Sequence, residues 1–396
     1  MGINEGRYKN EKGMGNRMKK KRNRKKYTRY LAGILAGIVL GTSIFEGSFI
    51  NARAEEATES QVSFLAVGDD LIHTQVYKAA KKKGRYDFSS IFANIKADVQ
   101  AADIAAINQE TIFVDKKYSG YPTFGSPKAL GYAIANAGFD VVTHATNHTM
   151  DRGTKAITGT LKFWNTKFPK IKVLGIHKNK TEVSKITVIQ KNGIKIAMLN
   201  YTYGLNGIKL PSKKSYMVDR LNSTKKMRSD IQKAKRQSDF VIVFAHFGTE
   251  YKYSPSSYQK KMASFFAKEG VDLLIGTHPH VVEPVRYVAG RNGHKMLTYY
   301  SLGNFVSCQK KPDRLLGGMA KVIIAKNEKG AYIKSYDMEP LVTHISSNKK
   351  YFTVYKLRNY TEALAKKNAI HKMAPKKKFT VKSLKSLYKK ITGRSV

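Results

Sequence analysis

The stretch VVTHATNHTM, residues 141–150, contains the pattern that best indicates the fold. It begins with apolar, β-forming residues and changes after Thr143 to a polar run that contains His144, Asn147 and His148. A buried strand rarely contains an amide and two imidazoles unless they are paired or functional. The stretch is therefore typical of a core strand that ends at a functional site.

The same arrangement recurs along the chain, because several short apolar runs are followed at once by polar residues. Runs of this kind, bounded by glycine and polar residues, indicate buried strands. Helical stretches at 225–238 and 257–269 separate some of them, which predicts crossover connections and a largely parallel sheet in an α/β protein. The predicted strands are Val62–Val67, Ile104–Ile107, Phe139–Val142, Phe240–Phe244, Val271–Ile275 and Leu297–Tyr300.

The polar clusters after these strands predict one metal site. Ligands of a parallel sheet bind beyond the carboxyl ends of its strands, where every cluster falls. Carboxylate oxygens, an amide oxygen and imidazole nitrogens suit divalent Zn, Mn, Fe or Mg. His278 and His280 stand two apart on a segment predicted to be extended, so both face one side. The predicted metal ligands are Asp69, Glu110, Asn147, His246, His278 and His280.

Four further side chains are candidates for the surroundings of this site. Asp151 and Glu250 are predicted to contact substrate at the pocket rim, with ion pairs to lysines as the alternative. His73 is either a metal ligand beside Asp69 or a residue that orients the metal ligands through hydrogen bonds. Asn304, in YYSLGNF, is predicted to hold a loop through hydrogen bonds to the backbone.

The charge of the chain is strongly positive. Among 396 residues there are 72 Lys and Arg but only 28 Asp and Glu, a formal net charge of +44. One interpretation is a lysine-rich, solvated surface without a specific partner. The other is a polyanionic partner, such as an acidic polymer, because a field of one sign attracts the opposite charge.

The N-terminal residues favour an exported protein. Residues 1–29 contain the cationic block KKKRNRKKYTR and are predicted to be a basic cytoplasmic segment. Residues 30–54 combine an apolar run with Ala52-Arg53-Ala54, which is typical of a signal peptide; an uncleaved signal anchor is the alternative. Either assignment places the rest outside the cytoplasm, at a bacterial cell surface, and argues against nucleic acid as the partner. Cys308 is the only cysteine, so no intrachain disulfide forms.

The remainder divides into a predicted domain at 61–345 and a basic C-terminal extension at 346–396. Lysine is frequent in residues 372–396, and apolar residues are scattered among the lysines. This composition predicts a solvated, partly disordered tail. An amphipathic basic helix on an anionic surface is the alternative.

The motifs also resemble those of a known family. AVGDDLIH, INQET, THATNHTMDRG, FAHFGTEY, GTHPHVVEP and YYSLGNF occur in that order between Gln61 and Phe305 and are similar to the motifs of the CapA/PgsA capsule-synthesis family. The resemblance implies a calcineurin-like metallophosphoesterase fold, a four-layer α/β/β/α sandwich. It also implies an extracytoplasmic role in making, exporting or anchoring poly-γ-glutamate.

The resemblance assigns roles to individual residues. Asp69 matches the first aspartate, Glu110 a metal-bridging carboxylate, and Asn147 and His148 the asparagine–histidine pair. Two departures from the phosphoesterase pattern are present: Leu71 stands where a histidine is usual, and Glu110 replaces an aspartate. The resemblance implies two metal ions. The two departures weaken its second implication, phosphatase activity.

Two functions follow from the sequence. In the first, the protein is a membrane-proximal subunit of a complex that synthesises or exports an anionic polymer, beside other capsule-synthesis subunits. In the second, it is a metal-dependent hydrolase of a phosphoester or amide bond, with His148 as the general acid. The charge and the N-terminal segment favour the first function.

Overall fold

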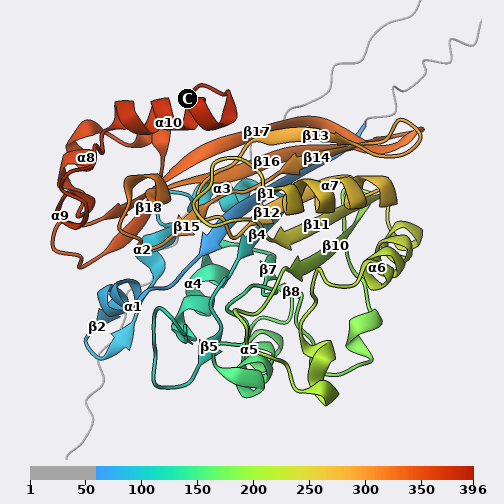
Figure 1. Ribbon diagram of the computed structural model, residues 1–396, viewed down its shortest axis with the longest axis horizontal. Helices are drawn as coiled ribbons and strands as arrows, with labels where there is room; N and C mark the ends of the chain where they lie inside the picture. Colours follow the sequence, from blue (N-terminus) through green and yellow to red (C-terminus); the bar gives the residue numbers. More distant parts are fainter. Residues whose placement is uncertain (1–58) are drawn as a thin grey trace, which may run out of the picture. The chain divides into compact units, whose positions relative to one another are not determined.

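The computed structural model describes residues 59–396, which form two large β-sheets with helices on their outer faces (Figure 1). The first sheet has the strand order β18-β17-β16-β1-β4-β7-β8, and β15 pairs with β1 beside this path. Its strands are β1 (Ser60–Asp70), β4 (Ile104–Asn108), β7 (Val141–Thr143), β8 (Lys172–Leu174), β15 (Asn304–Val306), β16 (Leu316–Asn327), β17 (Gly330–Ile345) and β18 (Phe352–Lys356).

The second sheet has the order β13-β14-β12-β11-β10-β9. Its strands are β9 (Thr187–Lys191), β10 (Ile194–Thr202), β11 (Phe240–His246), β12 (Leu273–Thr277), β13 (Val285–Ala289) and β14 (Lys295–Tyr299). Two short pairs complete the strands: β2 (Lys81–Lys82) with β3 (Arg85–Tyr86), and β5 (Phe113–Val114) with β6 (Ser126–Pro127).

Most helices connect the strands. They are α1 (Thr74–Ala80), α2 (Ser89–Phe92), α3 (Lys96–Ala101), α4 (Ala129–Ala137), α5 (Gly153–Lys167), α6 (Thr224–Gln237), α7 (Ser257–Glu269), α8 (Glu362–Lys367), α9 (Ile370–Met373) and α10 (Val381–Thr392). Short 3₁₀ turns are η1 (Glu182–Ser184), η2 (Ser212–Met217), η3 (Pro312–Leu315) and η4 (Leu357–Asn359).

The two sheets pack against each other through alternate residues of their strands. Phe64 of β1 meets Phe244 of β11, with ring centroids 6.3 Å apart, and both belong to the largest apolar core. The next residues along β11, such as Val243, belong instead to a second core with α6 and α7. The predicted mixed α/β architecture of two sheets between helices is therefore confirmed.

The predicted strands and helices agree with the structure at the centre of each sheet. The strands β1, β4, β7 and β8 are parallel, as are β10, β11, β12 and β14. The helix predicted at 257–269 has these bounds in the structure, and the one at 225–238 is shifted by one residue. The long antiparallel pair β16–β17 and its neighbour β18 have no counterpart among the predicted strands.

The last residues of the chain are not a solvated tail, and that prediction is wrong. Residues 381–392 form α10, whose side chains Leu384, Tyr388 and Ile391 are buried in the core of the first sheet. The hydroxyl of Tyr388 donates a hydrogen bond to the carbonyl oxygen of Met338 in β17. The apolar face of α10 is thus used within the fold, and its lysines point outward.

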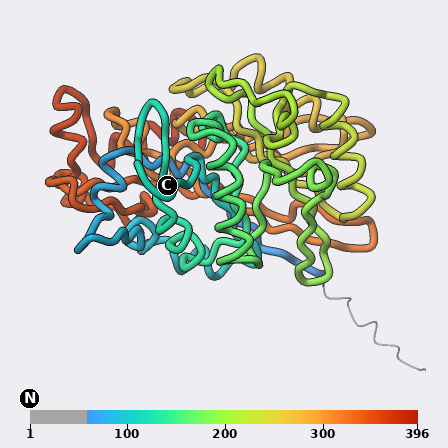
Figure 2. Tube along the Cα trace, turned by 90° about the horizontal axis from the view of Figure 1, so that it is seen from below, coloured from blue at the N-terminus to red at the C-terminus, as the bar shows by residue number. Residues whose placement is uncertain are grey.

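The C-terminal residues lie beside early parts of the chain. α2 packs against β18, and the red and blue parts of the chain lie at the same end in both views (Figures 1 and 2).

Among residues 59–396, no helix is both long and apolar enough to cross a bilayer. The basic segment 1–29 and the signal at 30–54 lie outside the described residues, so both stay predictions.

Candidate metal centre

The predicted ligands converge at the carboxyl ends of the parallel strands. Asp69 is the next-to-last residue of strand β1, and Glu110 follows β4 by two residues. Asn147 lies in the loop after β7, and His246 is the last residue of β11. His278 and His280 follow β12, so five strand ends from both sheets contribute to one region.

The carboxylate of Glu110 lies at the centre of this region. Its Oε1 atom is 3.7 Å from Nε2 of His246, 3.8 Å from Nε2 of His280 and 3.9 Å from Nε2 of His148. Both carboxylate oxygens are buried without a hydrogen-bond partner among the described residues. Burial raises the pKa of Glu110 well above its ordinary value, and the nearby carboxylate of Asp69 raises it further. A buried, ionised carboxylate requires a cation beside it.

His278 and His280 complete a compact ligand set with Glu110. Ligand atoms from these three residues lie within 4.8 Å of one another, and Nδ1 of His278 has no hydrogen-bond partner among the described residues. The extended segment predicted for these two histidines is absent, and that prediction is wrong. Their φ angles are 97° and 59°, in the left-handed region that non-glycine residues rarely occupy. Backbone strain of this kind accumulates at functional sites, where it aims side chains.

His246 and Asn147 lie against this set. Oδ1 of Asn147 is 2.8 Å from Nε2 of His246, and Oγ1 of Thr277 is 2.9 Å from its Nδ1. Burial, followed by the charges of His278 and His280, lowers the pKa of His246 well below its ordinary value. The imidazole is therefore neutral at pH 7, which is the form that binds a metal ion.

Asp69 adjoins the set from the first sheet. Its Oδ1 accepts a hydrogen bond from Nδ2 of Asn108 at 2.8 Å, and both oxygens lie within 3.3 Å of the amide nitrogen of His278. Its Oδ2 is 3.0 Å from Nδ1 of His280, which is also 3.0 Å from Oδ1 of Asn304. These acceptors hold the Nδ1 proton of His280 and leave its Nε2 lone pair facing Glu110.

The arrangement fits a divalent metal ion. Ligand atoms about 2.0–2.2 Å from one ion lie roughly 3.0–3.5 Å from each other, close to the spacing around Glu110. The donors are oxygen and imidazole nitrogen without thiolate, which suits Zn, Mn, Fe or Mg. A carboxylate without partners and an unpartnered imidazole nitrogen are the groups that such an ion would satisfy. The number of ions stays a prediction.

His148 and Asp151 form a buried pair beside the ligands. Nδ1 of His148 lies 2.7 Å from Oδ2 of Asp151, which also accepts a hydrogen bond from the amide of Phe124. Asp151 therefore positions His148, while its predicted contact with substrate stays a prediction. The Nε2 atom of His148 faces Glu110.

An open cavity of about 490 Å³ leads to the site. Glu250 is exposed on its rim, in agreement with the predicted position, while its contact with substrate stays a prediction. His73 also lines the cavity, and burial lowers its pKa to about 4. Nδ1 of His73 receives a hydrogen bond from the amide of Cys308, which leaves Nε2 as its free nitrogen. Asn304 donates to the carbonyl oxygens of His280 and Arg314, as predicted for a loop-holding residue.

His144, the other histidine of the opening stretch, is structural. Its Nε2 accepts a hydrogen bond from the indole of Trp164 at 3.0 Å, and burial lowers its pKa to about 3.

Sequence patterns missed two polar residues that do reach the site. Asn206 contacts both Asn147 and His148, and Asn108 joins Asp69 to Thr143. Asn206 lies in the long polar connection after β10, where no strand end marks it.

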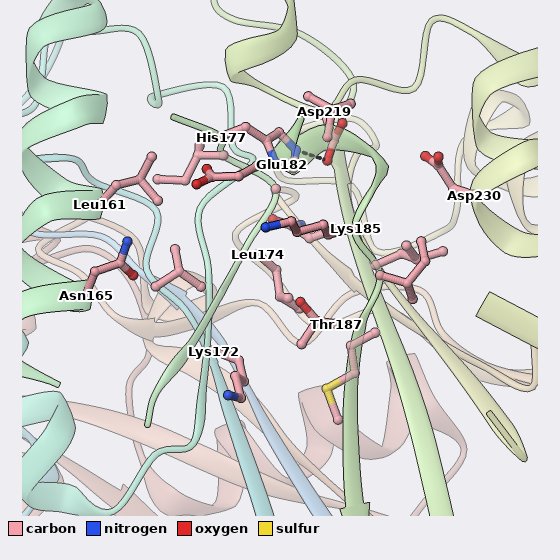
Figure 3. A pocket seen from close by; sticks show the side chains of 18 of the residues that line it. Leu161, Asn165, Lys172, Leu174, His177, Glu182, Lys185, Thr187, Asp219 and Asp230 are labelled. Carbon is pink, nitrogen blue, oxygen red and sulfur yellow. Dashed lines mark hydrogen bonds and ion pairs between the residues drawn. The ribbon is translucent and has the colours of Figure 1, made fainter. Parts of the chain in front are cut away.

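A separate cavity of about 500 Å³ lies between the edge strands β8 and β9 (Figure 3). His177 and Asp219 pair at its upper end, with 2.6 Å between Nε2 and Oδ2. Glu182 lies beside them, and Asp230 also lines the cavity. None of the predicted metal ligands lines this cavity.

Together, the fold and the site define an α/β protein with a two-sheet core and a candidate metal-binding site at the strand ends. The chain belongs to the family described as bacterial capsule synthesis protein PGA_cap, whose model matches residues 63–309. It is 27% identical to the PGA biosynthesis protein CapA of Bacillus subtilis (strain 168), over 70% of this chain and 71% of that protein. It is 26% identical to the capsule biosynthesis protein CapA of Bacillus anthracis, over 72% and 70%.

Solved structures that align with this chain include a calcineurin-like phosphoesterase and an NAD nucleotidase. The calcineurin-like phosphoesterase YfkN of Bacillus subtilis aligns with a TM-score of 0.44 and 14% identity, over 71% of this chain and 90% of that one. The NAD nucleotidase of Haemophilus influenzae aligns with a TM-score of 0.47 and 13% identity, over 72% and 58%. The family predicted from the motifs is thus confirmed by the family model and the two relatives.

Proposed function

We propose that the protein works outside the cytoplasmic membrane in the synthesis, export or anchoring of an anionic capsule polymer such as poly-γ-glutamate. It acts there as a metal-binding subunit beside other capsule-synthesis subunits. The observation that carries the proposal is the buried carboxylate of Glu110, which lies among imidazoles and has no hydrogen-bond partner among the described residues, in a chain of the capsule synthesis family. Both relatives are named as CapA proteins of polymer or capsule biosynthesis.

The charge of the protein supports a polyanionic partner. Its formal net charge of +44 favours association with a chain that has a carboxylate on every residue. A bound divalent ion would add a positive centre that holds a carboxylate or polarises a carbonyl. Glu110, Asn147, His246, His278 and His280 hold that ion in the proposal, with Asp69 completing the set from the first sheet.

The second candidate function is metal-dependent hydrolysis at the cell surface. The observation that favours it is the His148–Asp151 pair, which no metal-holding role requires. Oδ2 of Asp151 accepts a hydrogen bond from Nδ1–H of His148 and fixes the ring, so that Nε2 can give a proton to a leaving group in the cavity. Asn206 contacts the same histidine and adds to its positioning.

The test compares two variants in cells that lack the wild-type gene. His278→Ala removes a proposed ligand, whereas His148→Ala removes only the proposed proton donor. If the protein handles the polymer through its metal centre, His148→Ala still supports surface polymer and His278→Ala does not. Loss of polymer in His148→Ala, with metal content of the purified variant unchanged, would establish hydrolysis as the function. Normal polymer in His278→Ala would refute both.

A further inference from the structure

A second open cavity, of about 620 Å³, is lined almost entirely by lysines. Two segments far apart in the sequence form it: α1 with β2, and the turn between β17 and β18. No acidic residue lines it. Its lining residues are Gln75, Lys78, Ala79, Lys81, Lys82, Lys349 and Lys350, and we call it the lysine cavity.

Most of these charges have no counter-charge. Lys82 pairs with Asp87 at 3.2 Å, but no carboxylate lies within 4 Å of the other four lysine amines among residues 59–396. Like charges that face one another repel, by about 1 kcal/mol per pair at 4 Å even in water. A multivalent anion in the cavity would contact several amines at once and replace this repulsion with attraction.

The lysine cavity lies close to the metal centre. His73, which lines the cavity of the metal centre, is the residue directly before α1. Lys78 follows it by five residues, or about 7.5 Å along the helix. An extended polymer of a few residues therefore spans from one cavity to the other.

We propose that the lysine cavity binds carboxylates of the anionic polymer and holds the chain beside the metal centre. This inference rests on the proposed function and adds to it a polymer-docking surface. Arginine, which recognises phosphate through two parallel hydrogen bonds, does not line the cavity. Lysines act as point charges, so they suit a flexible chain with regularly repeated carboxylates.

The cavity between β8 and β9 provides a contrast within the same fold (Figure 3). Glu182, Asp219 and Asp230 line it together with Lys172 and Lys185. A polyanion there would meet three carboxylates, which disfavours binding by like-charge repulsion. Positive charge without a carboxylate in the lining thus distinguishes the lysine cavity from the other one.

The experiment reverses two charges in the cavity and two elsewhere. Lys78→Glu with Lys350→Glu alters the lysine cavity. Lys260→Glu with Lys268→Glu changes two exposed lysines of α7, so it lowers the net charge equally and serves as the matched control. Full-length wild type and both double variants are titrated with fluorescently labelled poly-γ-glutamate oligomers at several salt concentrations, after equal melting temperatures have been verified.

The inference predicts that the cavity variant binds the oligomer about tenfold more weakly or worse, with a shallower salt dependence, because two charge-assisted contacts are lost. The control should stay within about twofold. Lys78→Ala with Lys350→Ala should fall between them and guards against misfolding of the glutamate variant. Equal weakening in cavity and control variants would overturn the inference, since it would show that only net charge matters.

Two further outcomes are informative. If the cavity variant loses affinity for inorganic polyphosphate but not for poly-γ-glutamate, the cavity does not serve a polycarboxylate and the inference fails. If wild type binds no poly-γ-glutamate even at low salt, the proposed function itself fails. Wild-type binding that both double variants retain leaves the proposed function standing and refutes only the lysine cavity.

Discussion

Replacing Glu110 with glutamine should weaken metal binding and stabilise the metal-free protein, two effects of opposite sign. Glutamine has nearly the same shape but removes the negative charge that faces three imidazole nitrogens at 3.7–3.9 Å. Breaking a buried charge pair by removing one partner typically costs about 3–5 kcal/mol, which corresponds to a dissociation constant roughly 10²–10⁴-fold higher.

The gain in stability follows from the raised pKa of Glu110. Burial raises this pKa, so the folded, metal-free protein keeps the Glu110 proton at pH values where the unfolded chain, with an ordinary pKa near 4.5, has released it. The free energy of unfolding of the wild type therefore falls as pH rises above that value. Glu110→Gln has no such proton, so its advantage over wild type should be absent at pH 4 and grow towards pH 8.

Two measurements check this prediction. Competition with a chelator of known affinity gives the dissociation constants for Mn and Zn, and urea unfolding with EDTA at pH 5 and pH 8 gives the stabilities. Glu283→Gln, which also removes a buried carboxylate but contacts none of the ligands, serves as the control for metal binding. Wild-type metal affinity in Glu110→Gln would refute the proposed role of this residue, and so would a stability difference that does not change with pH.

Two other predictions test the fold. Burial raises the pKa of Glu283 to about 8 from an ordinary 4.5; the wild type should therefore lose up to about 1.4 kcal/mol per pH unit between these values relative to Glu283→Gln, and parallel stability curves in urea unfolding would contradict this. Leu384→Ala should lower the free energy of unfolding by about 2–5 kcal/mol in the same assay, because this side chain lies on the buried face of α10. Lys385→Ala, on the exposed face of α10, should lower it by less than about 0.5 kcal/mol. Equal effects would show that α10 is not packed in solution.

Hydrophobic runs predicted the central strands because parallel strands buried on both faces are apolar without interruption. The polar residues that follow Val67, Ile107 and Phe244 indicated most of the site from the sequence alone. The strands β16 and β17 are half exposed along part of their length, so their pattern is mixed and gave no comparable signal.

Other features depended on tertiary structure. Neither position of the left-handed backbone at His278 and His280 holds a glycine or asparagine that would signal it, and in the structure the amide of His278 donates hydrogen bonds to Asp69. Asp151 was assigned to the rim because its pairing with His148 depends on the turn that precedes α5. Lysine-rich composition concealed the helical spacing of Leu384 and Tyr388, which pack against the first sheet.

The central claim is that the strand ends form a divalent metal centre. It is tested most directly by elemental analysis of full-length protein purified after growth with Mn and Zn, beside His278→Ala prepared in the same way. At least about one bound divalent ion per wild-type chain is expected, with occupancy sharply reduced in the variant because an imidazole ligand is missing. Wild-type protein with well under one ion per chain, or a variant with the same content as wild type, would contradict the claim.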